Sequence, residues 1–133
     1  MKVTKEPIFE RLKHSVQLLA SPAEIQLRSL PDFVCKGDEL ALDFDQWHTT
    51  VLNNYGSTLT ANQLSSLAEL NERLDWLSNK EREYWSDRAV CHSDEWEKIR
   101  GLARKVLESF QWPEEIPPSH ANEFRRVETD KSN

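Results

Sequence analysis

Residues 38–56 read DELALDFDQWHTTVLNNYG, and this stretch decides the fold class. Its apolar residues recur every three or four positions, which is the spacing of one face of an amphipathic helix. Gly56 follows the last of them, where a left-handed helix terminus favours glycine. An aspartate, Asp32 or Asp38, is expected to cap the helix start. The apolar face comprises Leu40, Phe44, Trp47, Val51 and Tyr55.

The same spacing recurs along most of the chain, which holds only three glycines and so has little material for hairpins. We therefore predict an all-α protein, an irregular bundle of four longer helices and one or two short ones. Ser21, Thr60 with Gln63, Ser86 and Ser93 are expected to cap helix starts. Besides the helix just described, helices are expected over residues 5–20, 22–30, 61–79, 86–91 and 94–110.

Prolines change the character of the chain after its last predicted helix. Pro113, Pro117 and Pro118 forbid helix, so Ile116 and Phe124 are expected to pack within an extended, Pro-rich C-terminal strap. A length of 133 residues is typical of one domain. We predict a single helical domain over residues 1–124 and a polar tail over residues 125–133.

The negative charge of the chain is concentrated near its middle. The formal net charge is −6, which argues against a protein that binds the nucleic-acid backbone. Residues 31–60 carry five acidic side chains against Lys36 alone. Such a cluster predicts either a solvated outer helix face or a negative patch that docks a basic protein partner. The candidate partner-binding carboxylates are Asp38, Glu39, Asp43 and Asp45.

The five tryptophans divide into two groups by position. Trp47 and Trp96 fall on predicted apolar faces and are expected to anchor the core. Trp76 lies beside an apolar face, and Tyr84 and Trp85 lie in an irregular charged segment. We expect these three to form an exposed aromatic contact for the partner, with satellite packing as the alternative.

Catalytic signatures are not found in the sequence. The three glycines are isolated, so no phosphate-binding loop can form, and no zinc-type spacing occurs. Asp43, Asp45 and His48 could serve a small metal-dependent enzyme, which is one alternative reading. Because Asp43 and Asp45 point about 200° apart on a helix, we expect neither a metal nor a cofactor.

Cysteine use and hydropathy bear on the compartment. Cys35 and Cys91 are expected to be free, partly buried thiols, and His92 diverges from Cys91 on a helix. No apolar run is long enough for a membrane span, and the N-terminus turns polar where a signal peptide would be apolar. A cytoplasmic protein without membrane contact is expected.

A short, acidic, helical chain of this kind resembles the bacterial immunity proteins that neutralise toxin domains in contact-dependent growth inhibition. The resemblance covers residues 5–112 and lies in size, charge and helical character. It implies tight binding to a basic toxin domain, which would occlude the toxin's active or substrate-binding site. A helical adaptor or regulator of a cellular protein is the main alternative.

Overall fold

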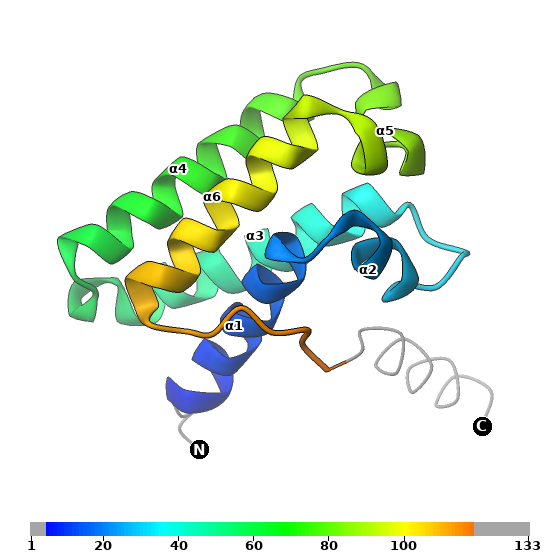
Figure 1. Cartoon of the computed structure of the whole chain (residues 1–133). Coiled ribbons are helices and arrows are strands. Elements are labelled where there is room, and N and C mark those ends of the chain that lie inside the picture. The colour runs from blue at the N-terminus through cyan, green and yellow to red at the C-terminus, as the bar shows by residue number, and fades with distance from the viewer. Residues whose placement is uncertain (1–4, 119–133) are drawn as a thin grey trace, which may run out of the picture.

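The structure, a computed structural model, describes residues 5–118 and is helical, with no strand among those residues. The all-α prediction is confirmed (Figure 1). The longer helices are α1 (Lys5–Ala20), α3 (Lys36–Tyr55), α4 (Ala61–Ser78) and α6 (Asp94–Phe110), and the short ones are α2 (Ala23–Arg28) and α5 (Asp87–His92). Two single 3₁₀ turns, η1 (Gly56–Thr58) and η2 (Arg82–Trp85), complete the set.

The four longer helices bury one core between them. Helix α1 packs on both α3 and α6, and α4 runs antiparallel beside α6 (Figure 1). Helices α3 and α4 meet each other only sparsely. The predicted apolar faces are buried or partly buried, except that Leu64 is exposed; Trp47 and Tyr55 are among the partly buried side chains. Among the largest fully buried side chains are Leu12, Phe44, Leu67, Leu70, Trp96 and Ile99.

Several helix boundaries follow the capping chemistry expected from the sequence. Thr60 and Gln63 form a complete capping box at the start of α4. The Ser86 and Ser93 hydroxyls accept hydrogen bonds from backbone amides in the first turns of α5 and α6. Each such bond satisfies an amide that has no partner inside its helix.

Two predicted helix caps are wrong. The Ser21 hydroxyl donates to the Gln17 carbonyl oxygen at 2.8 Å, so α2 starts after Pro22 without a side-chain cap. Gly56 has a φ of −55°, because the chain continues through it into η1 in a right-handed conformation. The left-handed residue that ends a helix is Gln111, with a φ of 59°.

The start of α3 also differs from the prediction. Cys35 is its N-cap residue and makes no side-chain cap hydrogen bond. Asp32 instead pairs with Lys36 at 3.1 Å, and Asp38 lies inside the first turn of α3. Asp38 pairs with Arg82 of η2 at 3.1 Å, so both aspartates act as partners of cations and not as caps.

A buried polar network joins α2, α5 and α6. The Arg100 side chain donates to Gln26 and to the backbone oxygen of Val90, each at 3.0 Å. Gln26 in turn donates to the carbonyl oxygens of Leu18 and Leu19 at the end of α1. The network therefore fixes the short helices α2 and α5 against the long ones.

The segment after α6 is non-helical, as its prolines predict. Gln17 holds it to α1 by donating to the Pro113 carbonyl oxygen at 2.9 Å. Ile116 is 62% exposed, so the prediction that its side chain packs against the helices is wrong. Phe124 and the predicted tail at 125–133 lie outside the described residues.

Candidate functional site

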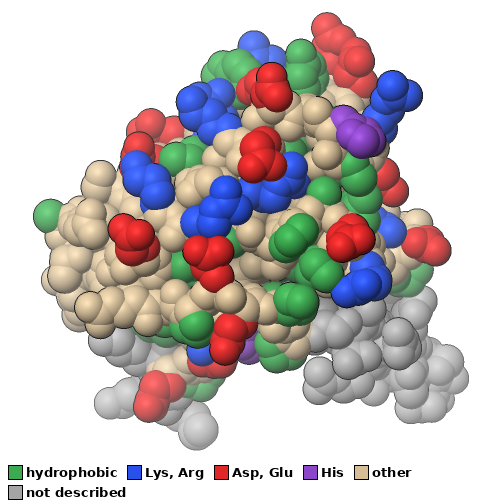
Figure 2. Space-filling view, in the orientation of Figure 1, with side chains coloured by type: hydrophobic (Ala, Val, Ile, Leu, Met, Phe, Trp, Pro, Cys, Tyr) green, Lys and Arg blue, Asp and Glu red, His purple; other side chains and the backbone are tan. Residues whose placement is uncertain are grey.

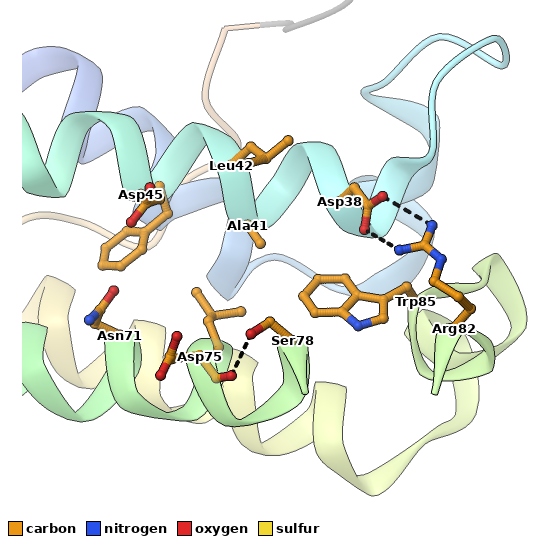
Figure 3. A pocket seen from close by; sticks show the side chains of 11 residues that line it. Asp38, Ala41, Leu42, Asp45, Asn71, Asp75, Ser78, Arg82 and Trp85 are labelled. Carbon is orange, nitrogen blue, oxygen red and sulfur yellow. Dashed lines mark hydrogen bonds and ion pairs between the residues drawn. The ribbon is translucent and has the colours of Figure 1, made fainter. Parts of the chain in front are cut away.

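A cleft of about 400 Å³ opens between α3 and α4 and is closed at one end by η2 (Figure 3). We call it the α3–α4 cleft. Its floor is apolar and its rim carries charged and polar groups. The lining residues are Asp38, Ala41, Leu42, Phe44 and Asp45 of α3, Asn71, Leu74, Asp75 and Ser78 of α4, and Arg82 and Trp85 of η2.

The cleft exists because α3 and α4 pack mainly on different helices, α3 on α1 and α4 on α6. Small side chains, Ala41 on α3 and Ser78 on α4, leave the facing surfaces apart. Phe44 and Leu74, both buried, form the apolar floor beneath them.

Close backbone packing fixes the end of the cleft at η2. A Cβ atom on Gly37 would lie 2.7 Å from the Trp85 carbonyl oxygen, so only glycine allows α3 and η2 to approach this closely. The Trp85 indole nitrogen donates to the Leu77 carbonyl oxygen at 3.2 Å. The Trp85 ring also meets Trp96 edge-on, with 5.7 Å between ring centroids.

This packing corrects one prediction. Trp85 is only 6% exposed, and it is therefore not the exposed aromatic that its charged surroundings indicate. Its ring lines the cleft as part of the wall. Tyr84 is half-buried, and its carbonyl oxygen accepts the Trp96 indole N–H at 2.8 Å.

The charges at the cleft do not balance. Asp38, Asp45 and Asp75 line it together with a single cation, Arg82. The two terminal nitrogens of Arg82 donate to the two oxygens of Asp38 at 3.2 and 3.1 Å, and these bonds and the charge of Asp38 raise the pKa of Arg82. Within residues 5–118, the carboxylates of Asp45 and Asp75 form no hydrogen bond or ion pair.

Both unpaired carboxylates project into the space between the two helices, Asp45 from α3 and Asp75 from α4 (Figure 3). His48 lies behind the floor, stacked on Phe44 at 5.0 Å between ring centroids. Burial lowers the pKa of His48, and Asp45 offsets only part of that effect. His48 is therefore neutral at pH 7 and leaves the negative charge of the cleft uncompensated.

The surface over α4 and α6 has a different electrostatic character. Acidic and basic side chains alternate there, as Figure 2 shows. Ion pairs join the two helices, Arg73 with Glu95 at 3.6 Å and Lys105 with Glu69 at 3.2 Å. Arg73 and Lys105 on this face therefore have acidic partners, in contrast to Asp45 and Asp75 of the cleft, which have no cation among the residues that the structure describes.

Trp76 lies on this mixed surface and is 41% exposed, as expected. Arg73 and Lys80 both pack over its ring, at 4.8 and 4.4 Å from the centroid. Trp76 lines a shallow groove with Lys98 and Leu102 of α6, separate from the α3–α4 cleft. The predicted partner-binding set is thus divided, since Asp38, Asp45 and Trp85 line the cleft while Glu39, Asp43, Trp76 and Tyr84 do not.

The candidate metal triad is not assembled. Asp45 lines the cleft, His48 is buried behind Phe44, and Asp43 does not line the cleft. In the described part of the chain, no three His, Cys, Asp or Glu side chains are grouped so that they could hold a metal ion.

The two cysteines are free, as expected, but both are exposed and not partly buried. The Cys35 sulfur lies 3.5 Å from a terminal nitrogen of Arg82. Its position at the start of α3 places it beside the cleft entrance and outside the apolar core.

Two charged cleft residues, Asp75 and Arg82, lie outside the partner-binding set predicted from the sequence. Asp75 follows Glu72 and Arg73, and Arg82 belongs to the charged run at residues 80–83, so both lie in stretches of mixed sign that do not stand out as an acidic cluster. One local signal marks Asp75, because a carboxylate in the last turn of a helix opposes the helix dipole.

Comparison of the chain with protein-family models, curated proteins and solved structures found no match. Across residues 5–118, none of the helices has both the length and the apolar composition needed to cross a membrane. The geometry of the α3–α4 cleft therefore carries the functional argument.

Proposed function

We propose that the protein binds a protein partner and that the α3–α4 cleft receives a positively charged segment of it. The observation that carries this proposal is the pair of carboxylates, Asp45 and Asp75, which line an apolar-floored cleft and have no cationic partner of their own among the described residues. A cationic side chain that enters the cleft would gain attraction from both.

The position of these carboxylates supports a binding role, because they do not stabilise the fold. Asp75 lies in the last turn of α4, where a negative charge opposes the helix dipole. Asp45 adds a like charge across the cleft. Residues that oppose local stability in this way are characteristic of functional sites.

The exposed apolar surface defines the second requirement for the occupant. Leu42 is 60% exposed at the rim, beside the buried floor of Phe44 and Leu74. An apolar side chain next to the cation would cover Leu42 as it docks. The occupant is therefore a short amphipathic segment with at least one basic residue.

As the biological role, we propose neutralisation of a basic toxin domain in the cytoplasm by an immunity protein. The small size, acidity and helical character of the chain support this role. A helical adaptor that binds a basic segment of a cellular protein would use the same cleft. A toxin gene directly before the gene for this protein would favour the immunity role over the adaptor role.

Selection from a random peptide-display library tests the binding proposal and requires no assumption about the partner's sequence. The immobilised wild-type protein is expected to enrich peptides in which Arg or Lys lies next to an apolar residue. The Asp45→Lys/Asp75→Lys variant should lose that enrichment. Both positions are exposed and helical, so lysine is compatible with the fold there.

A matched control changes the net charge by the same amount elsewhere. Glu72→Lys/Glu108→Lys reverses two exposed carboxylates that do not line the cleft, and it should retain the enrichment. Equal loss in both variants would show that net charge alone attracts the peptides. Enrichment of neutral or acidic peptides would contradict the proposal.

A further inference from the structure

We propose that the docked cation is an arginine and that it displaces Arg82 from Asp38. In the free protein, Arg82 would thus occupy the position that the partner's guanidinium takes in the complex. This inference rests on the proposed function of the α3–α4 cleft and identifies the chemistry of its occupant.

The geometry of the Asp38 carboxylate points to arginine. Both of its oxygens accept a hydrogen bond from Arg82, at 3.2 and 3.1 Å, in the two-pronged arrangement that a planar guanidinium makes. A lysine ammonium is a point charge and cannot present two parallel N–H groups in one plane. The cleft therefore already contains a carboxylate arranged for a guanidinium.

Arg82 can leave this carboxylate without disturbing the fold. Its side chain is 72% exposed, and its other contact is with the exposed Cys35. The backbone of η2 is held independently, through the approach of Trp85 to Gly37 and the hydrogen bond from Trp85 to Leu77. Displacement therefore needs only a rotation of the side chain into solvent. An exposed ion pair of this kind contributes little free energy, so breaking it costs little.

Displacement also changes the charge that the occupant meets. With Arg82 in place, one of the three carboxylates at the cleft is neutralised. After Arg82 rotates away, Asp38, Asp45 and Asp75 all face the occupant. The Arg82–Asp38 pair would thus discriminate against segments whose cation cannot replace it on Asp38.

The probe is a blocked synthetic pentapeptide, acetyl-Leu-Ala-Arg-Ala-Leu-amide, together with its lysine counterpart. Binding to the full-length protein is measured by NMR titration, following the indole N–H of Trp85 at the cleft wall. The wild-type protein should bind the arginine peptide about three-fold or more tightly than the lysine peptide.

Removing the competitor should strengthen binding. Arg82→Ala is expected to tighten binding of the arginine peptide about two- to five-fold. Arg82→Lys retains the charge but loses the two-pronged bond, and it should show a smaller gain. Arg88→Ala is the matched control, because Arg88 is exposed on α5 and does not line the cleft.

The outcomes separate this inference from the proposed function. If Arg82→Ala binds no more tightly than Arg88→Ala, or if the two peptides bind equally well, the inference is wrong. In that case, loss of binding in Asp45→Lys/Asp75→Lys would leave the proposed function standing. If neither peptide binds wild-type protein at millimolar concentration, both proposals fail.

Discussion

Replacing Gly37 with alanine tests the packing that closes the α3–α4 cleft. The new Cβ would lie 2.7 Å from the carbonyl oxygen of Trp85 and 3.3 Å from its carbonyl carbon. Both are backbone atoms, so no flexible side chain can move aside. Overpacking of this kind costs about 1–3 kcal/mol. Alanine recovers about 0.5–1 kcal/mol of helix propensity, which leaves a net loss of up to about 2.5 kcal/mol, and of about 1.3 kcal/mol at the middle of both ranges.

Gly101→Ala is the matched comparison, with the opposite expected sign. A Cβ at this position in α6 meets nothing closer than a terminal nitrogen of Arg104 at 3.8 Å. Helix propensity alone then predicts that Gly101→Ala raises the free energy of unfolding by about 0.5–1 kcal/mol.

Urea unfolding followed by circular dichroism measures both free energies. With an m-value of about 2 kcal/mol per molar urea, Gly37→Ala should lower the midpoint by about 0.6 M. Gly101→Ala should raise it. A Gly37→Ala variant at least as stable as the wild type would refute the account of how η2 is held against α3.

Three further predictions concern single side chains. Asp75→Asn should stabilise the protein by about 0.3–1 kcal/mol in urea unfolding, because it removes a negative charge from the C-terminal end of α4. A loss of stability would show that the Asp75 carboxylate makes a favourable interaction in the folded protein. Burial lowers the pKa of His48 below 6.5, so the unfolded chain takes up the proton first as the pH falls, and stability should decrease below about pH 6.5. His48→Gln should reduce the difference in urea midpoint between about pH 7.5 and 5.5, and an unchanged difference would assign the pH dependence to other groups. Arg100→Met should lower the free energy of unfolding by about 2–4 kcal/mol in the same assay, because the acceptors on Gln26 and Val90 are then buried without donors. A decrease of less than about 1 kcal/mol would contradict this role for Arg100.

Local patterns in the sequence predict the fold class and most helix boundaries. The apolar spacing of α3 and the Thr60–Gln63 capping box each lie within one element, so neither depends on tertiary packing. Gly56 is a weaker guide, because glycine permits a left-handed terminus without requiring one. The chain instead adopts that conformation at Gln111, after α6.

The candidate site is only partly predictable from the sequence. Asp38 and Asp45 stand out because they belong to a dense acidic run on one helix. Asp75 and Arg82 join them only because α4 and η2 fold beside α3. No local pattern states that two helices will leave a cleft between them.

The burial of Trp85 also depends on distant residues. Its immediate neighbours in sequence are charged or polar except for Tyr84, which favours an exposed position. Its actual position is set by Gly37, nearly fifty residues away, and by the Leu77 carbonyl oxygen that accepts its N–H. Such contacts become visible only in the folded structure.

Chemical-shift mapping of the isotope-labelled protein, with a basic peptide enriched in the display selection, checks the claim that the α3–α4 cleft docks a cationic protein segment. We predict saturable shifts that are largest at the amides of Ala41 and Asn71 and at the Trp85 indole N–H. Shifts centred instead on Trp76 and Lys98, in the groove between α4 and α6, would contradict the claim.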